Sequence, residues 1–444
     1  MITSPRLSRR SILAGLAVGA VTFAAPAHAA SLDASDLGLH PASSRHQTER
    51  LQKAMDQAAR EGRALMLPSG AYRVSELRVP AGLALSGAPG ATLLTTGAGP
   101  IARIADAADV TLQAISFVGA EGQSGDGGLL EIINSTGIHI RDCRFSGSPA
   151  DGLVLRKAEA RVEACRFDQH NNAAIFSLDS LGLIIRDNRI SDCGNNGILI
   201  WGSSSHDDNS IVLGNTIGRI DWRGGGNGQN GNGINVFRAN NVIVSDNQIS
   251  DCAFSAIRLN ATDNTQVRGN TCRNSGEVAI FSEFSFSGSL ISDNIVDGAA
   301  GGISVTNFNE NGRLAVVSGN LVRNIQPGSS VNPDTTPFGI AAEADAAVTG
   351  NVVENVPGVG IAAGWGPYLR DVLVADNLVR TVRVGIAVSV AEGAGSAQVS
   401  GNMVSGATRA AIVGSAWRDI VSADLAADIA RFPALSVSSN RIVP

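Results

Sequence analysis

One pattern recurs along this 444-residue chain and restricts the folds that it can adopt. Two apolar residues flank one variable position, and Asn or Cys follows three positions later, as in Ile138–Phe145 and Leu183–Ile190. The Asn or Cys stands at Cys143, Cys165, Asn188, Asn215, Asn247, Asn270, Asn294, Asn320, Asn351, Asn377, Asn402 and Asn440. Successive members are 22 to 38 residues apart, a period that is typical of a solenoid.

A second short motif follows each Asn or Cys position, with Gly or Ala before an alternating apolar run. Gly197–Ile200 and Gly302–Val305 are examples. Alternation with a period of two indicates strands that have one face inward, and no helical stretch separates them. We therefore predict an all-β, right-handed parallel β-helix, a solenoid of roughly 12 coils, with an N-terminal capping helix.

The Asn position has a physical explanation, because stacked amides can hydrogen-bond to one another along the axis of the solenoid. Cys143 and Cys165 occupy this position in early coils, and Cys272 takes the apolar position after Asn270, so these three are expected in the core. Asp or Gly usually precedes the Asn. The aspartates resemble a calcium-binding stripe, but both residue types also tolerate turn geometry, which is the preferred interpretation.

The first 29 residues have the features of an export signal. Arg9 and Arg10 precede an apolar run to Ala25, and Ala27–Ala29 offers a small-residue cleavage site. The paired arginines predict a twin-arginine signal peptide at 1–29 and a periplasmic or secreted protein, unless the pair occurs by chance in an ordinary signal.

The remainder, 30–444, is predicted to be one domain. Its N-terminal cap covers 45–80 and includes an amphipathic helix at 46–61. A C-terminal coil or cap is expected at 416–444, with a short helix at 423–431.

Composition restricts the partners. The net charge of −6, with no basic run, argues against nucleic acid. It argues mildly against a strongly acidic polymer, unless local arginines or a metal offset the field. No later segment is long and apolar enough to cross a bilayer, no cofactor motif is identified, and the oligomeric state stays open.

After the predicted helix come Leu67-Pro-Ser-Gly-Ala-Tyr-Arg-Val74 and Leu85–Ala88. This arrangement resembles the N-terminal module of the pectate-lyase-like superfamily, which includes polygalacturonases, pectate lyases, alginate epimerases and phage tailspikes. The whole chain also resembles twin-arginine-translocated β-helix repeat proteins, a group without an established activity. The resemblance implies a polysaccharide or oligosaccharide partner, and a role as glycoside hydrolase, polysaccharide lyase or epimerase. The alternative is a non-catalytic glycan-binding or envelope scaffold protein.

The catalytic motifs of these relatives are missing, so none of their catalytic residues can be carried over. Candidate residues follow instead from two outward-facing columns on the second strand of each coil and from the insertions beside them. Exposed aromatic, amide and arginine side chains suit stacking on sugar rings and fixing of hydroxyls. The predicted substrate-binding residues are Trp201, Asn235, Phe237, Arg238, Asn260, Phe281, Trp222 and Trp365. The other interpretation is that the insertions at 202–210, 218–232 and 325–338 cover these aromatics as a satellite core.

Two carboxylates provide a candidate catalytic pair. Glu283 and Glu343 lie two coils apart in one column, about 9.5 Å by the strand spacing, near the upper carboxyl separation of inverting glycosidases. Either residue can also be an ordinary solvated acid. A lyase or epimerase would rely on Arg258, Arg238 or His206 instead. His206 beside Asp207 and Asp208 is a candidate for acid–base chemistry, and one His with two acids is too little to assign a metal.

Overall fold

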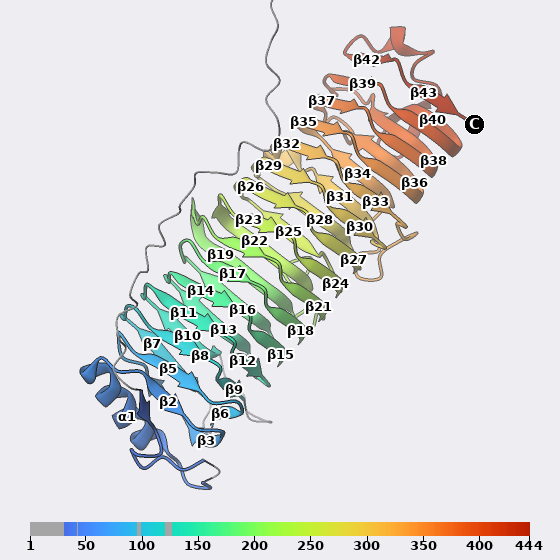
Figure 1. Ribbon diagram of the computed structural model, residues 1–444. Helices are drawn as coiled ribbons and strands as arrows, with labels where there is room; N and C mark the ends of the chain where they lie inside the picture. The colour runs from blue at the N-terminus through green and yellow to red at the C-terminus, as the bar shows by residue number, and fades with distance from the viewer. Residues whose placement is uncertain (1–30, 42, 96–98, 120–126) are drawn as a thin grey trace, which may run out of the picture.

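A computed structural model shows an elongated solenoid whose coils stack from an N-terminal cap to the C-terminus (Figure 1). It describes residues 31–41, 43–95, 99–119 and 127–444. The expected signal peptide lies outside this part of the chain. Every pairing between strands of successive coils is parallel, so the predicted parallel β-helix is confirmed.

One face of the solenoid is a 16-stranded sheet that carries the apolar half of the repeat. In spatial order its strands are β1 (Leu32–Asp33), β2 (Leu65–Leu67), β5 (Ala84–Gly87), β8 (Thr111–Gln113), β11 (Ile138–Arg141), β14 (Ala160–Glu163), β17 (Ile184–Arg186), β20 (Ile211–Leu213), β23 (Ile243–Ser245), β26 (Asp263–Arg268), β29 (Ser287–Ser292), β32 (Arg313–Ser318), β35 (Ala344–Thr349), β37 (Arg370–Ala375), β39 (Ala397–Ser400) and β42 (Leu435–Ser438). The last twelve each precede an Asn or Cys position, so the repeat accounts for all coils from β11 onward.

A second sheet of 27 strands forms the other faces. The strands that directly follow an Asn or Cys position are β12 (Arg144–Ser146), β15 (Arg166–His170), β18 (Arg189–Cys193), β21 (Thr216–Ile220), β24 (Gln248–Cys252), β27 (Thr271–Ser275), β30 (Ile295–Asp297), β33 (Leu321–Arg323) and β43 (Arg441–Val443). In the coils before the first such position, the equivalent strands are β3 (Gly70–Val74), β6 (Ala91–Thr95) and β9 (Ser116–Val118). The outer columns lie on β4 (Leu77–Arg78), β7 (Ala102–Ala105), β10 (Gly128–Ile133), β13 (Asp151–Arg156), β16 (Ala173–Leu178), β19 (Asn196–Asp207), β22 (Asn232–Asn240), β25 (Ile257–Asn260), β28 (Val278–Glu283), β31 (Gly301–Val305) and β34 (Phe338–Ala342). In the last coils both series merge into β36 (Val352–Ala363), β38 (Leu378–Ser389) and β40 (Met403–Ala416), and β41 (Asp419–Ser422) forms an antiparallel hairpin with β40.

A ladder of buried amides connects the coils. Asn247 Nδ2 donates to Asn270 Oδ1 at 2.9 Å, and Asn270 Nδ2 donates to Asn294 Oδ1 at 3.0 Å. The same Oδ1 atoms accept the backbone N–H of the Asn one coil before, at 3.0 and 2.9 Å. The ladder runs from Asn188 to Asn440, so the predicted role of the Asn position is confirmed.

The residue before each Asn occupies the left-handed region of backbone space. Asp187 and Asp246 have φ values of 57° and 56°, and Gly269 and Gly319 have 65°. Gly, Asn and Asp adopt this region most readily. The alternation of Asp and Gly is therefore explained by the turn, as predicted, without a calcium ion.

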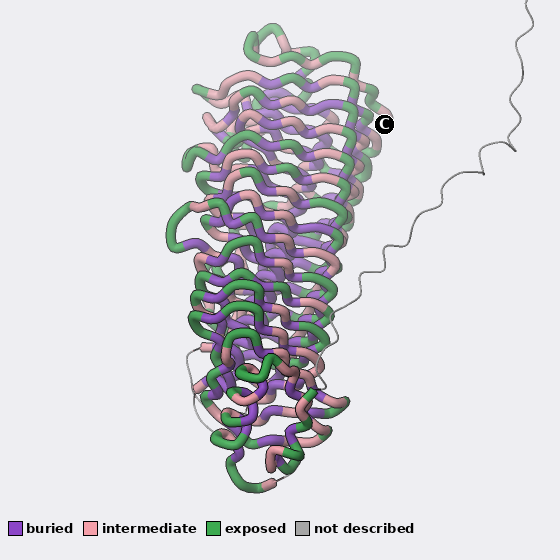
Figure 2. Tube along the Cα trace, turned by 60° about the vertical axis from the view of Figure 1, so that its left-hand side comes forward, coloured by how far each residue is buried: buried purple, intermediate pink, exposed green. Residues whose placement is uncertain are grey.

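The interior is one continuous apolar cluster, and burial alternates along every coil (Figure 2). Phe117, Phe145 and Phe167 stack on successive coils with ring centroids 4.9 and 4.7 Å apart. All five cysteines are buried and unpaired, including the three that were expected in the core. His170 ends β15 and is 1% exposed, and this burial lowers its pKa to about 4.

The N-terminal cap of the solenoid agrees with the prediction, and the C-terminal end agrees only in part. Helix α1 (Thr48–Glu61) buries Leu51, Ala54, Met55 and Ala58, as expected for a cap. The helix predicted at 423–431 is wrong in extent, because only Ile429–Arg431 forms a 3₁₀ turn, η2. Asp424 accepts the N–H of Ala427 there, a local bond that competes with regular helix. No helix in the described ranges is long and apolar enough to span a membrane.

The amide ladder leads to a first prediction. Asn270→Ala removes two acceptor bonds and leaves the buried N–H and Nδ2 of Asn247 without their partner. We expect a loss of about 2–3 kcal/mol in the free energy of unfolding, measured by urea denaturation. The matched variant is Asn440→Ala at the part-buried end of the ladder, where about 1 kcal/mol is expected. Equal losses at the two positions would contradict a role for burial in the ladder.

Candidate functional site

The outward columns lie in register, as the repeat predicts. Strand pairing aligns Asn235 with Arg258 and Arg258 with Phe281 on successive coils. The second column aligns Trp201 with Phe237, and Asn260 with Glu283. The structure therefore brings most of the predicted site residues to one face, although it gives them different surroundings.

Aromatic residues of the two outward columns form an edge-to-face row. Trp201 lies 5.8 Å from Phe176 on one side and 5.8 Å from Phe237 on the other, between ring centroids. Trp201 Nε1 donates to Asn235 Oδ1 at 3.3 Å, and the Arg238 guanidinium lies 4.7 Å from the Phe237 ring centroid. These rings are half-buried against one another, so they form a packed ridge with little free ring face.

Trp222 does not join this row. It lies in the segment 221–231, packs on Phe254 at 5.2 Å, and donates from Nε1 to the carbonyl of Gly226. The insertion at 202–210 was expected as a loop, and this is wrong for its first part. Strand β19 continues through Asp207 with an irregularity between Trp201 and His206.

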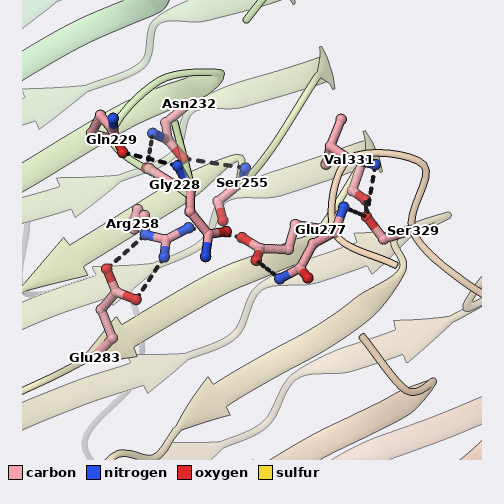
Figure 3. Close-up of polar contacts among 12 residues, drawn as sticks. Gly228, Gln229, Asn232, Ser255, Arg258, Glu277, Glu283, Ser329 and Val331 are labelled. Atoms are coloured by element: carbon pink, nitrogen blue, oxygen red, sulfur yellow. Dashed lines mark hydrogen bonds and ion pairs between the residues drawn. The ribbon is translucent and has the colours of Figure 1, made fainter. Parts of the chain in front are cut away.

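Arg258 is the centre of a buried ion cluster (Figure 3). Its Nε and Nη2 donate to the two oxygens of Glu283, and Nη1 donates to Glu277 Oε2, all at 2.7 Å. Asn260 Nδ2 adds a bond of 2.8 Å to Glu283. The exposed fractions of the three charged side chains are 7% or less, so the cluster is shielded from solvent.

Two loops close over this cluster. Asn332, in the segment 324–337, donates to Glu277 Oε1 at 2.8 Å. Gly228 lies on the Arg258 guanidinium so closely that a Cβ there would be 2.4 Å from Cζ. Arg258 is therefore enclosed and paired with two carboxylates, so its own charge is not available to a uronate, and Glu283 is held by two groups. The geometry does not favour Glu283 or Arg258 in direct chemistry.

Beyond the cluster, the outer face is hollowed into a groove of about 550 Å³. Its floor consists of the small outward residues Ala341, Ala362 and Ala387, followed by Val413 on the next coil. One wall contains the loop residues Asn332–Phe338 and the side chains of Pro357, Arg383 and Arg409. The opposite wall contains Thr306, Glu343, Trp365, Trp417 and Arg418. We call this hollow the outer groove.

Glu343 is the most perturbed carboxyl of the outer groove. It follows β34 directly, is 7% exposed, and accepts the backbone N–H of Phe308 at 2.7 Å. Burial raises its pKa to about 7, against a smaller lowering by backbone hydrogen bonds from Phe308 and Asn307. A carboxyl with this pKa can give or take a proton near neutrality, which suits a general acid or base.

Asp334 lies at the other end of the same strand. It is exposed, belongs to the loop before β34, and lines the outer groove. Glu343 and Asp334 thus flank the five residues of β34 that cross the floor. This arrangement places two carboxyls of different environment on opposite walls.

A pair of tryptophans marks the C-terminal part of the groove. Trp365 and Trp417 meet edge to face with centroids 5.6 Å apart, and their exposed fractions are 40% and 49%. Trp417 sits in the hairpin between β40 and β41 with φ 55°, and a Cβ on Gly366 would lie 2.5 Å from its ring. These rings keep free faces, unlike the row around Trp201.

The structure keeps His206 and Asp207 out of the outer groove. His206 Nε2 lies 3.6 Å from Oδ2 of the fully buried Asp208, and burial raises the pKa of Asp208. Asp207 is exposed, and neither residue lines the groove. Their predicted catalytic role stays a prediction without support from this geometry, as does that of Arg238, which lines a separate hollow with Ser203–Ser205.

Sequence reasoning missed Asp334, Arg383, Arg409, Trp417 and Arg418. Asp334 belongs to a loop and Trp417 and Arg418 to the hairpin turn, which the repeat does not align, whereas Arg383 and Arg409 lie on the long strands β38 and β40. One signal was present: both outward columns become small from Ala362 and Gly364 onward, and a run of small residues on an outer face predicts a hollow. Of the predicted substrate-binding residues, Phe281 and Trp365 line the outer groove.

The family model described as "Right handed beta helix region" matches residues 104–226 and 226–379. No curated protein sequence matches the chain significantly. Two solved structures illustrate the fold similarity. The catalytic unit of the GH87 α-1,3-glucanase from Streptomyces thermodiastaticus is 16% identical, with a TM-score of 0.53, covering 87% of this chain and 69% of the glucanase.

The enzymatically active domain of tailspike protein 2 from bacteriophage CBA120 is 15% identical, with a TM-score of 0.51. The match covers 66% of this chain, which spans about half the length of the tailspike chain, 48%. At such identities the likeness establishes the shared fold and leaves the chemistry to be argued from the residues described above.

The ion cluster gives a second prediction. Arg258→Ala leaves two buried carboxylates without their counter-charge, and we expect a loss of about 3–5 kcal/mol in unfolding free energy by urea denaturation. The control is Arg219→Ala, which breaks an exposed bidentate pair with Asp192 and is expected to cost at most about 1 kcal/mol. Similar small losses for both variants would show that the cluster is not buried in solution.

The burial of Glu343 gives a third prediction that needs no substrate. Because its folded pKa is about 7 and its ordinary value is 4.5, the stability contribution is fully present below pH 4.5 and is lost as pH rises through 7. We expect wild type to lose about 3 kcal/mol relative to Glu343→Gln over this window. Urea denaturation of both proteins at pH 4.5, 6 and 8 measures the difference. Glu354→Gln, at an exposed pair with Arg380, should show no such trend, and parallel curves for Glu343→Gln would refute the raised pKa.

Proposed function

This chain belongs to the right-handed β-helix family, and from that premise we propose that it holds a polysaccharide in the outer groove and hydrolyses it. The observation that supports this best is the groove itself. It combines an apolar floor, two tryptophans with free ring faces, and a buried carboxyl whose pKa is raised to about 7. Sugar rings stack on such aromatic faces, and binding sites of this kind combine apolar walls with a few convergent polar groups.

Glu343 is the proposed general acid. Protonated near neutrality, it would donate its proton to the oxygen of the scissile glycosidic bond as that bond breaks. The attacking water releases its proton to solvent as it adds to the sugar carbon, and the products carry one added water in total. Asp334 is not assigned as the base, because β34 separates it from Glu343 by roughly 16 Å, more than the roughly 6.5–9.5 Å of an acid–base pair. The pair Glu283 and Glu343 is not retained either, because Glu283 is held by Arg258.

Binding without turnover is the second candidate function. The two tryptophans and the apolar floor are sufficient to hold a glycan, and this would suit an adhesive or scaffold role in an envelope. The two candidates share the groove and differ in what Glu343 does. We also propose that the protein works outside the cytoplasm, periplasmic or secreted, which the signal-like residues 1–29 support.

The fourth prediction tests turnover. The protein is incubated with pectin, alginate, hyaluronan and bacterial envelope polysaccharides, and the products are analysed by mass spectrometry. We expect fragments with an added water, a rate at least about 100-fold lower for Glu343→Gln, and loss of turnover as pH rises through 7. Glu354→Gln should keep full activity.

Other outcomes are equally informative. Fragments that lack the added water would identify a lyase and overturn the hydrolytic assignment. Full activity of Glu343→Gln would reject the proposed acid. If no polymer is cleaved or epimerised but one binds, and Trp417→Ala weakens that binding about ten-fold or more, glycan binding without turnover is the function.

A further inference from the structure

Three arginines surround the C-terminal half of the outer groove. Arg383 lies on β38 between Val382 and Val384, and Arg409 lies one coil further on β40, where Val382 pairs with Ala407 and Val384 with Ala410. Arg418 follows Trp417 in the hairpin on the opposite wall. All three side chains belong to exposed residues and line the same hollow.

These arginines differ from those that form ion pairs on the surface of the coils. Several arginines elsewhere pair with an acid on a neighbouring coil, as do Arg219 with Asp192, Arg323 with Asp297 and Arg370 with Asp345. On β38 itself, Arg380 pairs with Glu354 at 3.2 Å. By contrast, Arg383, Arg409 and Arg418 have no ion-pair partner within the described ranges. The outer groove thus gathers three positive charges without ion-pair partners, in a chain whose net charge is −6.

The acids of the groove lie elsewhere. Glu277 is held by Arg258 and Asn332, and Asp334 and Glu343 flank β34, two coils before Arg383 and three before Arg409. With about 4.8 Å per coil, the arginine-bearing coils are roughly 10 and 14 Å along the axis from the Glu343 coil. The groove therefore has an acidic end for the reacting bond and a basic end beside the two tryptophans.

We propose that Arg383, Arg409 and Arg418 form an anion subsite that selects an acidic glycan and fixes its direction in the outer groove. This rests on the proposed function, since it assigns a substrate class to the same groove. The acidic substituent, a carboxylate or a sulfate, is carried by a sugar other than the one beside Glu343. Guanidinium groups bind both anions through paired N–H donors, and aromatic rings alongside hold the sugar that bears the anion.

The positive charges of Arg383 and Arg409 also disfavour a neutral polymer as the preferred ligand. Two like charges on adjacent coils repel each other when the groove is empty, and an anion between them relieves that repulsion. A neutral sugar would leave the repulsion in place. Discrimination between acidic and neutral glycans is therefore expected to come from this pair, and shape recognition from the tryptophans.

The test compares matched ligands by isothermal titration calorimetry. Oligogalacturonate, oligomannuronate and hyaluronan oligosaccharides are each titrated beside the carboxyl-reduced form, and dextran sulfate beside dextran. We expect at least one acidic ligand to bind about ten-fold or more tightly than its neutral counterpart, with an affinity that falls as salt rises. The double variant Arg383→Gln/Arg409→Gln should bring the acidic ligand within about two-fold of the neutral one. The carboxylate and sulfate arms identify which anion is preferred.

The matched control is Arg380→Gln, which removes one positive charge from the same strand but outside the groove and should keep the preference. If acidic and neutral forms bind equally, or if the double variant keeps the preference, the anion subsite is wrong. The proposed function then still stands wherever a neutral ligand binds and Trp417→Ala weakens it. If no ligand of either kind binds, both proposals fail.

Discussion

Stacking of coils in a fixed register is the constraint on which the rest of this molecule depends. Each buried Asn accepts from the coil before it and donates to the coil after it, which ties neighbouring coils together at the same turn. A slip by one residue would turn apolar side chains outward and break the ladder at once. Every outward residue therefore has a defined neighbour about 4.8 Å away on the next coil.

Because outward residues have regular neighbours, a charged side chain on one coil can form an ion pair with an opposite charge on the next coil. Several outward arginines meet an acid one coil away, and Arg258 meets two in a pocket closed by loops. Groups paired in this way stabilise the solenoid and leave little for chemistry. The features proposed for function lie where the outward columns lose this regularity. Small residues open the groove, Glu343 is buried without a neighbouring cation, and Arg383 and Arg409 have no ion-pair partner among the described residues.

The sequence predicts the fold well because the fold is local and repeated. The Asn positions, the Asp or Gly before them and the apolar face of α1 each report one physical requirement, and each was correct. It predicts which residues share a column for the same reason, as for Asn260 and Glu283. The sequence does not predict which loops cover an outward column of side chains. The loop that brings Asn332 to Glu277 and the hairpin that carries Trp417 are insertions outside the repeat. The groove itself forms where the outward side chains are small, so no large side chain in the repeat marks its position.

The two ends of the outer groove affect each other through charge. Burial favours the neutral form of Glu343, and nearby positive charge favours the ionised form; burial dominates, since backbone hydrogen bonds are the opposing contributions. The coils of Arg383 and Arg409 are roughly 10 and 14 Å away along the axis, about one screening length at physiological salt. An anionic sugar bound there would cancel even that weak field and exclude water from the groove, and both changes hold the proton on Glu343. A substrate that carries its charge at a distance from the reacting bond would thus keep the acid in the form that donates.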